Sequence, residues 1–400
     1  MHPNKIKALA AAYFNETAAI RKHLHRHPEL SFQEEATAAF VSAKLDAYGI
    51  RHRKNIGGHG VVAHIEGKDP GKACLALRAD MDALPIQETA THDYASANAG
   101  VMHACGHDAH TAMLLTAGRI LHEIRHDFRG SITLIFQPAE EVLPGGALGV
   151  IDSGVLQQPR AAAILGQHVL PSLESGKIGL RSGPFMASGD EINIRVKGRG
   201  GHAAMPEAIH DTVLIASQIV VSLQQLVSRM APPSVPSVLS FGRLIADGLH
   251  NIIPDEVLIQ GTFRTFDETW REKAKGHIRQ IAEHTAAAAG AAAEVNIDQG
   301  YPFLENDAGM SQIAFEAARQ FVGPENVMEL DMRMTTEDFA HYAQIMPACF
   351  YRLGSGNKEK GIQAGLHTSD FDIDESSLQT GSGMMAWMAL QQLNDLCNKA

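Results

Sequence analysis

The chain has 400 residues, 45% of them hydrophobic and 20% charged, which is enough for more than one domain with a sizeable buried core. Its formal net charge of −11 makes it a poor candidate for a nucleic-acid-binding protein, because contacts with phosphates require clustered Lys and Arg. No run of about 18 apolar residues appears, so the sequence predicts no membrane span.

The N-terminal segment MHPNKIKALAAAYFNETAAIRK has the pattern of an amphipathic helix. It lacks the apolar core and the small-residue cleavage site of a secretion signal. The cysteines form no C-x-x-C pair, and unpaired thiols are typical of a reducing compartment. The four are Cys74, Cys105, Cys349 and Cys397. We therefore expect a cytoplasmic protein.

Helices and strands alternate over the first half of the chain. Residues 33–48 and 110–125 carry apolar residues at helical spacing, and Asp108 stands where it could cap the second of these helices. Apolar runs predict strands at 60–67, 73–80, 131–141 and 161–168. Short strands that alternate with helices indicate an α/β fold with a mostly parallel sheet.

The pattern changes near residue 186. DEINIRVKGRGGHAAMP alternates like a half-exposed antiparallel strand; a helix over 211–229, two strands, a helix over 268–289 and a last strand follow. Strand–helix–strand–strand–helix–strand is the order of a small α+β sandwich. The α/β pattern then resumes with helices over 307–321 and 375–397. We predict one domain of residues 1–185 and 300–400, with a smaller domain, residues 186–299, inserted in it.

Candidate metal ligands gather where the apolar strands end. Ligands of open α/β sheets bind beyond the carboxyl ends of the strands. One acidic residue after a strand is usually a solvated turn or a helix cap, but several such sites at one edge predict a metal centre. The candidates are Asp80, Asp82, Cys105, His107, Asp108, His110, Glu140, Glu141 and His168.

The mixture of thiolate, imidazole and carboxylate suits Zn²⁺, Mn²⁺, Co²⁺ or Ni²⁺ better than Mg²⁺ or Ca²⁺. Two ions about 3.5–4 Å apart would use this many groups. A carboxylate beside them could take a proton from water and deliver it to a leaving amine. Glu140 and Glu141 point in different directions at an extended strand end, so one can be a base and the other a ligand.

The motifs resemble those of the aminoacylase and carboxypeptidase metallopeptidase superfamily, within it the branch of hippurate hydrolases and indole-acetyl-amino-acid hydrolases. The similarity covers nearly the whole chain. The motifs that carry it are HLHRHPELSFQEEAT, RADMDALPI, MHACGHDAHTAMLL, FQPAEE, GQHVLPSLESGKIG, GGHAAMP, NIIPDEVLIQGTFRTFD, TTEDFAHY and GLHTSDFDIDE. The resemblance implies that residues 1–185 and 300–400 form a catalytic metal-binding domain and that 186–299 form a lid and dimerisation domain.

The resemblance also implies roles for single residues of the metal-binding domain. Glu140 is the implied general base, and Asp82 resembles the aspartate that orients a metal-binding histidine in related branches. His103 and His110 are expected to support the ligands or to pack, not to bind metal. The implied ligands of two divalent ions are Cys105, His107, Glu141, His168 and His367.

Three residues of the inserted domain complete the implied site. His202 in GGHAAMP resembles a histidine that crosses to the partner subunit and stabilises an oxyanion, although a His after Gly-Gly is most often a turn residue. Asn251 and Arg264 resemble groups that hold the substrate's carboxylate, which a guanidinium matches in bidentate fashion. If these residues act across subunits, the protein is a homodimer or a homotetramer.

The implied function is metal-dependent hydrolysis of N-acyl amino acids to a carboxylic acid and a free amino acid. A dipeptidase or carboxypeptidase of the same superfamily is one alternative, and a catalytically silent binding protein is another, which the intact ligand set disfavours. Departures from the pattern of this branch at Glu207, at Asp211 and in VLPGGALG put the specificity in doubt. The sequence also leaves the acyl group, the amino acid and the metal open. His23, His25 and His27 precede a proline and are expected to be surface or hinge residues.

Overall fold

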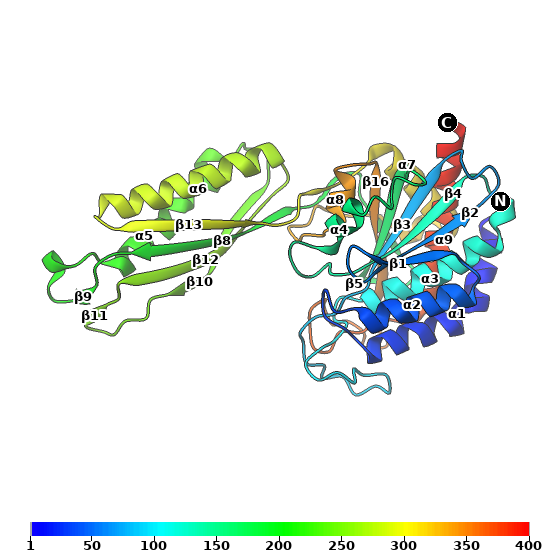
Figure 1. Cartoon of the computed structure of the whole chain (residues 1–400), viewed down its shortest axis with the longest axis horizontal. Coiled ribbons are helices and arrows are strands. Elements are labelled where there is room, and N and C mark those ends of the chain that lie inside the picture. The colour runs from blue at the N-terminus through cyan, green and yellow to red at the C-terminus, as the bar shows by residue number, and fades with distance from the viewer. Residues whose placement is uncertain (1, 400) are drawn as a thin grey trace. The chain divides into compact units, whose positions relative to one another are not determined.

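The computed structural model describes residues 2–399, which form two compact units (Figure 1). Unit 1 comprises Met1–Gly183, Glu305–Asp331 and Asp338–Ala400, and unit 2 comprises Pro184–Leu304 and Met332–Glu337. The sequence places the insertion at 186–299 and contains no sign that Met332–Glu337 returns to unit 2. This segment is tied there by backbone hydrogen bonds, since the N–H of Ala187 donates to the carbonyl of Arg333.

An eight-stranded sheet forms the centre of unit 1, in the order β1-β2-β4-β3-β5-β16-β6-β15. The pairs β4–β3, β3–β5 and β5–β16 in its middle are parallel. The central strands β3 and β4 are continuous apolar runs because both of their faces are buried. The strands are β1 (His52–Ile56), β2 (Gly60–Glu66), β3 (Cys74–Asp80), β4 (Ser131–Gln137), β5 (Ala163–Glu174), β6 (Ile178–Leu180), β15 (Val327–Glu329) and β16 (Ala348–Gly356).

Helices pack around this sheet and supply most of the core of unit 1. Helices α1, α3 and α9 pack against one another, and α7 packs against α9. Their apolar residues form one buried cluster with the strands. The helices are α1 (Pro3–Arg26), α2 (Glu35–Ala47), α3 (His107–Glu123), α4 (Gly146–Asp152), α7 (Ala308–Val322), α8 (Ala340–Ala343) and α9 (Ser376–Lys399). Two short strands, β7 (Gly183–Met186) and β14 (Leu304–Asn306), lie where the chain passes between the units.

Unit 2 is an antiparallel sheet, in the order β10-β12-β8-β13, with two helices (Figure 1). Each helix begins at an aspartate whose side chain accepts a backbone N–H, Asp211 for α5 and Asp267 for α6. The elements are α5 (Thr212–Leu223), α6 (Glu268–Ala288), β8 (Ser188–Lys197), β9 (Gly201–His202), β10 (Ser237–Ile245), β11 (Ile252–Ile253), β12 (Glu256–Thr265) and β13 (Ala292–Gln299). The predicted fold class, an α/β domain with an inserted α+β sandwich, is confirmed.

Three sequence expectations are wrong in detail. Asp108 does not cap α3, because the helix begins one residue earlier, at His107, and Asp108 is buried inside its first turn. His168 does not end its strand, since β5 continues to Glu174 alongside β16. His23 and His27 are exposed as expected, but His25 is fully buried, because it lies on the inner face of α1.

One described helix, Thr212–Met230, is long and apolar enough to cross a membrane by length and composition, with a mean hydropathy of 1.3. The core helix of a globular domain passes the same test. Its inner face belongs to the core of unit 2 through Ile215 and Ile219. Its outer face is apolar as well, since Leu214 is 54% and Val221 is 73% exposed. We interpret the helix as a core element with a second, exposed apolar face.

Candidate metal centre

The five predicted metal ligands come together in unit 1 from four separate segments of the chain. Overlapping groups of three link them all, and the ligand atoms within each group lie within 4.8 Å of one another. The segments are the turn into α3 for Cys105 and His107, the loop after β4 for Glu141, the middle of β5 for His168 and the loop after β16 for His367.

The distances between the ligand atoms are those of groups that share ions. The Sγ of Cys105 is 3.4 Å from the Nε2 of His168. The Oε1 of Glu141 is 3.3 Å from the Nε2 of His367 and 3.7 Å from the Nε2 of His107. Glu141 therefore lies within reach of two imidazoles and would hold a metal ion together with them.

Unpartnered atoms show that these residues fit a metal. The Nε2 of His107 and the Oε1 of Glu141 are buried without a hydrogen-bond partner, which is costly unless another ligand is present. The Nδ1 of His168 lies 2.7 Å from the carbonyl of Val169 and donates to it, so its Nε2 keeps a lone pair on the side of Cys105. Burial and the nearby carboxylates raise the pKa of Cys105 well above its ordinary value, so the thiolate requires a cation.

The turn between the first two ligands depends on a glycine. Gly106 has φ +84, in the left-handed region that favours glycine. A Cβ at this position would also lie 2.6 Å from the Cγ2 of Val169. Gly106 thus lets the backbone turn between Cys105 and His107 while it lies directly against β5. The spacing Cys-Gly-His in the sequence follows from this close approach.

Asp82 holds His107 in the orientation that a ligand requires. Its Oδ1 is 3.1 Å from the Nδ1 of His107, which leaves the Nε2 facing the other ligands. Its Oδ2 accepts hydrogen bonds from the hydroxyl of Ser31 at 2.7 Å and from the N–H of Glu141 at 3.0 Å. Asp82 is 1% exposed, so this carboxylate links two ligands in the interior and does not need to touch an ion.

We expect Asp82→Asn to weaken metal binding about 10- to 100-fold, because the amide no longer fixes the tautomer of His107 as the carboxylate does. Competition with a chromophoric chelator measures the dissociation constant. Asp46→Asn is the matched control, since the side chain of Asp46 is 75% exposed. Equal metal affinity in the two variants would contradict the orienting role of Asp82.

A buried network supports the ligands from behind. The Nδ1 of His110 donates to the Oδ1 of Asp80 at 2.6 Å, and its Nε2 accepts the N–H of Val169 at 2.9 Å. Both nitrogens of His110 are therefore used, which matches the expectation that it supports the ligands. Asp80 also accepts from Arg78 at 2.5 Å. The network fixes β5 and thereby His168.

Glu140, the predicted base, is held by a residue to which the sequence assigned no role. The backbone N–H of Asp338 donates to the Oε1 of Glu140 at 3.3 Å. The carboxylate of Asp338 in turn accepts from Arg78 at 2.6 Å and from Gln137 at 2.7 Å. Asp338 lies in the motif TTEDFAHY, and membership of that motif was the one signal for it in the sequence. Its partners could not be inferred from spacing, because they are about 200 residues or more away along the chain.

The turn that carries both glutamates is strained. Ala139, directly before Glu140, has φ +54, which is unfavourable for a residue with a Cβ. The buried carboxylate of Glu34 accepts the N–H of Ala139 at 2.8 Å and so holds this conformation. The motif HPELSFQEEAT thus contributes a positioning residue that the sequence did not single out.

The three predicted residues of unit 2 are placed within that unit. His202 lies on β9 and pairs with Ile252 of β11. Asn251 directly precedes Ile252, and its backbone carbonyl accepts the N–H of Ala203. Arg264 lies on β12, opposite Gly189 of β8. Their roles with respect to the metal centre stay predictions.

Comparisons with known proteins identify the family. The model of peptidase family M20/M25/M40 matches residues 76–391. The chain belongs to this family. It is 46% identical to an N-acyl-L-amino acid amidohydrolase of Geobacillus stearothermophilus over 77% of this chain and 83% of that protein. It is 37% identical to the IAA-amino acid hydrolase ILR1-like 4 of Arabidopsis thaliana over 98% of this chain and 90% of that protein.

A solved structure agrees with the M20 assignment. The chain resembles the YXEP protein of Bacillus subtilis, described as a dinuclear metal-binding peptidase from the M20 family, with a TM-score of 0.81 and 34% identity. The similarity covers 96% of this chain and 99% of that one. The branch inferred from the motifs is confirmed, and the M20 member described here is a hydrolase that acts on amide bonds.

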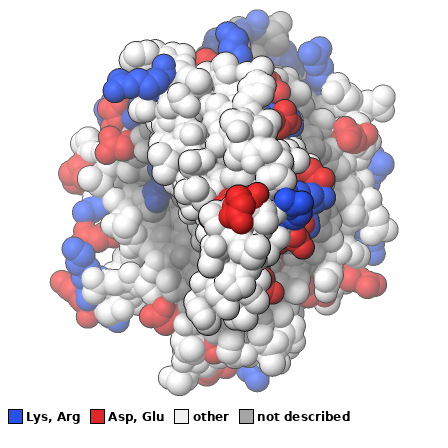
Figure 2. All heavy atoms as spheres, turned by 90° about the vertical axis from the view of Figure 1, so that its left-hand side faces the viewer, with Lys and Arg blue, Asp and Glu red and all other residues white. Residues whose placement is uncertain are grey.

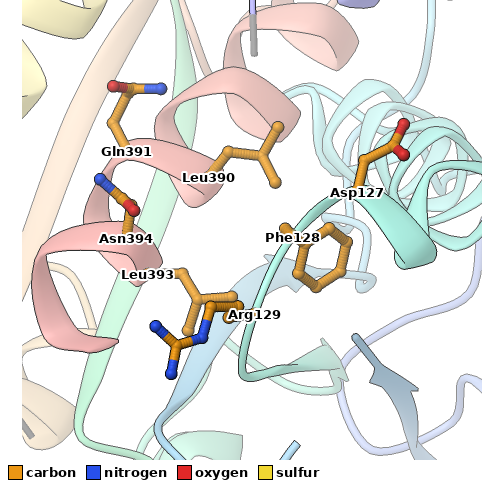
Figure 3. Close-up of a pocket in the computed structure, with 7 residues that line it drawn as sticks. All are labelled: Asp127, Phe128, Arg129, Leu390, Gln391, Leu393 and Asn394. Atoms are coloured by element: carbon orange, nitrogen blue, oxygen red, sulfur yellow. The ribbon is translucent and has the colours of Figure 1, made fainter. Parts of the chain in front are cut away.

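A cavity of about 280 Å³ lies in unit 1 apart from the M20 ligand cluster (Figure 3). Its charged lining residues already have partners, because Asp127 pairs with Lys5 and Arg129 pairs with Asp69. The charged residues that line this cavity are therefore not available to pair with a charged substrate. The metal centre remains the candidate active site. The lining residues are Asp127, Phe128, Arg129, Leu390, Gln391, Leu393 and Asn394.

Proposed function

We propose that this M20 hydrolase cleaves the amide bond of N-acyl amino acids and releases a carboxylic acid and a free amino acid. The observation that carries the proposal is the meeting of five ligands of three chemical kinds with a carboxylate, Glu140, beside them. The names of the relatives from Geobacillus stearothermophilus and Arabidopsis thaliana support this substrate class. A dipeptidase or carboxypeptidase is the second candidate, because a peptide amide requires the same chemistry.

We further propose that the ligand set holds two divalent ions of the group Zn²⁺, Mn²⁺, Co²⁺ and Ni²⁺. The description of the Bacillus subtilis structure as dinuclear supports the number, and the position of Glu141 near both His107 and His367 is compatible with it. When bound, such ions polarise a carbonyl and lower the pKa of water.

Glu140 is the proposed proton carrier. Its carboxylate takes a proton from the attacking water and gives it to the nitrogen of the leaving amine. The N–H of Asp338 occupies one oxygen of Glu140, so the carboxylate is held in one orientation. Glu140 is 7% exposed, and at such a site a held base needs little rearrangement in the transition state.

The residues of unit 2 carry donors suited to the proposed substrate. The Nδ1 of His202 accepts the N–H of Ala204 at 3.1 Å, so the proton of the neutral ring is on Nε2, which is available to donate to an oxyanion. The guanidinium of Arg264 is half-buried and occupies the space beside Gly189, where a Cβ would lie 2.5 Å from one of its nitrogens. Its Nε donates to the hydroxyl of Thr262, and a carboxylate is the ligand it matches best.

The arrangement within unit 2 supports a homodimer. Arg264 pairs with Gly189 at one end of the sheet, whereas β9 and β11, with His202 and Asn251, lie beyond its other end (Figure 1). The eight-residue step from Gly189 to Lys197 on β8 spans about 26 Å. One small substrate cannot reach both ends, so His202 and Asn251 serve it together with Arg264 only if one end comes from a second copy of the chain.

An apolar surface on unit 2 suits the contact between two copies. Leu214 and Val221 are exposed on α5, and Leu244 and Ile245 are exposed on β10, one of the two edge strands of the sheet. Figure 2 looks onto the end of unit 2 that carries β9 and β11, where most atoms in the middle of the view are uncharged. We therefore propose a homodimer through unit 2, from which a homotetramer can be built.

We expect Val221→Glu to dissociate the dimer into monomers, because it places a charge on a side chain that is 73% exposed in the single chain and buried in the proposed contact. Sedimentation equilibrium measures the mass. Ala287→Glu, at an exposed position of α6, is the control and keeps the wild-type mass. A wild-type monomer, or a dimer that Val221→Glu leaves intact, would refute this interface.

The proposed function is tested by amine release from a panel of N-acyl amino acids, with chelated protein to which Mn²⁺, Zn²⁺, Co²⁺ or Ni²⁺ is restored in turn. Metal-dependent cleavage of benzoyl-, acetyl- or indole-acetyl-amino acids is the expected result and identifies the preferred acyl group. Cleavage of free dipeptides alone would favour the peptidase. No cleavage of either class with any metal would rule out both candidates.

The proposed location is the cytoplasm. All four cysteines are buried and unpaired, which suits a reducing compartment.

A further inference from the structure

A second cluster of metal-binding side chains lies in unit 1 outside the M20 ligand set. It consists of His25 near the end of α1 and of Glu88 and His92 in the segment between β3 and α3. One ligand atom of each lies within 4.8 Å of the other two. None of the three takes part in the proposed reaction, so their arrangement needs another explanation.

The distances in this cluster fit the ligands of a single ion. The Oε1 of Glu88 is 3.2 Å from the Nε2 of His25 and 3.1 Å from the Nε2 of His92. Zinc binds imidazole nitrogen and carboxylate oxygen at about 2.0–2.2 Å, so neighbouring ligand atoms of a tetrahedral ion are about 3.3 Å apart. The two distances from Glu88 are close to that spacing, and the ligand atoms of the two histidines lie within 4.8 Å of each other.

Neighbouring groups orient two of the three side chains toward a common point. The Nδ1 of His25 is 2.8 Å from the Oδ2 of Asp108, which leaves its Nε2 facing Glu88. A carboxylate that holds a histidine in this way is typical of metal sites. The Oε2 of Glu88 accepts the N–H of Ser96 at 2.6 Å, so its Oε1 is the oxygen directed at the histidines. The nearby cation Arg21 is already paired with Asp108.

His92 is the side chain that the protein alone leaves unexplained. Its ring stacks on Tyr94 with centroids 3.8 Å apart, and both of its nitrogens are buried and form no hydrogen bond, although the Nε2 lies 3.1 Å from the Oε1 of Glu88. If the Nε2 of His25 carries a proton, it can donate a hydrogen bond to Glu88, but His92 still forms no hydrogen bond. One bound ion would interact with a ligand atom of all three residues. Burial lowers the pKa of His92 and keeps it in the neutral form that binds metals. His103, with two further unpartnered nitrogens, lies beside His25 at 6.5 Å between centroids.

We propose that His25, Glu88 and His92 bind a divalent cation of the zinc type, at a site separate from the two ions of the M20 centre. The ligands are two imidazoles and one carboxylate, which suit Zn²⁺, Co²⁺ or Ni²⁺. The ion fastens the segment that contains Glu88 and His92 to α1. That segment leads to Cys105, so the bound ion stabilises the approach to the M20 centre without touching the substrate.

Metal content after loading with Zn²⁺ and gel filtration tests the proposal. His92→Phe keeps a ring for Tyr94 to stack on but removes both nitrogens, and we expect it to retain one ion fewer than the wild type. His284→Phe makes the same chemical change at an exposed position of α6 and should retain the wild-type number. If His92→Phe and wild type bind equal numbers of ions, the proposed site does not exist.

A second measurement separates this site from the M20 centre. In a double variant, His107→Ala with Glu141→Ala, the M20 centre is disabled, and we expect one Co²⁺ to remain, which a further His92→Phe substitution removes. Its visible spectrum should lack the thiolate charge-transfer band that Cys105 would produce, because no sulfur belongs to this ligand set. A double variant that retains no ion, or one whose ion shows the thiolate band, would overturn the proposal. If the wild type binds no ions at the M20 centre, the proposed function is contradicted, but the proposal of a site at His25, Glu88 and His92 is not affected.

Discussion

Glu140→Gln is expected to lower kcat about 10²- to 10⁴-fold and to leave the metal content unchanged. Glutamine has the same shape, and its amide oxygen can still accept the N–H of Asp338, so the loop after β4 keeps its conformation. The amide cannot take a proton from water at neutral pH, and it cannot return one to the leaving amine. The substitution therefore removes the proposed chemistry and spares the neighbouring ligand Glu141.

The measurement pairs kcat on the preferred N-acyl amino acid with metal content by mass spectrometry. Glu329→Gln is the matched control, because Glu329 is an exposed carboxylate on β15 of the same unit. Turnover by Glu140→Gln within tenfold of the wild type would refute the assignment of the base. Loss of metal from Glu140→Gln would show instead that Glu140 is a ligand.

Arg21→Met is expected to reduce the free energy of unfolding by about 3–5 kcal/mol, because it leaves buried charge without its partner. The Nε of Arg21 donates to the Oδ2 of Asp108 at 2.8 Å, and its Nη2 donates to the Oδ1 of Asp372 at 2.8 Å. The side chains of Arg21 and Asp108 are both 0% exposed. Because methionine fills much of the volume of arginine, the decrease in unfolding free energy reflects the loss of the charge and not the creation of a cavity.

Urea unfolding of metal-free protein measures this effect without the contribution of bound ions. Lys5→Met is the control: Lys5 and Asp127 form a pair with side chains 53% and 45% exposed, and its loss is expected to cost less than about 1 kcal/mol. Equal effects of the two substitutions would contradict the buried network.

The loss of unfolding free energy in Arg21→Met, called the deficit below, also has a predictable pH dependence. Burial acts to raise the pKa of Asp372, but Arg21 and Tyr94 outweigh burial and lower it. A carboxyl whose folded-state pKa is depressed stabilises the fold above its unfolded pKa of about 4 and loses that contribution as the pH falls further. The deficit should therefore be full near neutral pH and shrink below pH about 4. A deficit that does not change with pH would contradict this explanation.

The sequence predicted which side chains lie together where candidate ligands follow the ends of strands. Asp82 and Glu141 were found because open α/β sheets collect ligands at the carboxyl ends of their strands. Spacing could not have revealed His367, which comes from the far end of the chain and was assigned by resemblance alone. The structure places it 3.3 Å from Glu141.

The supporting residues could not be predicted, because their partners are distant in sequence. Arg78 and Asp338 are 260 positions apart, and only the folded sheet brings them to 2.6 Å. The expectation that His25 is a surface or hinge residue is wrong, because α1 turns His25 toward the core while His23 and His27 stay exposed. The position of His25 four residues after Arg21, on a face of α1 that also contains Leu24, was the signal for burial.

The position of β16 in the sheet has a consequence for how the protein is made. β16 lies between β5 and β6, yet it follows them in the chain by the whole length of unit 2. A ribosome therefore delivers β5 long before its parallel partner exists, while the strands and helices of unit 2 emerge as one contiguous stretch, Pro184–Leu304. Unit 2 can complete its sheet first, and the nascent N-terminal half must wait, with an open strand edge, until Gly356 has been synthesised.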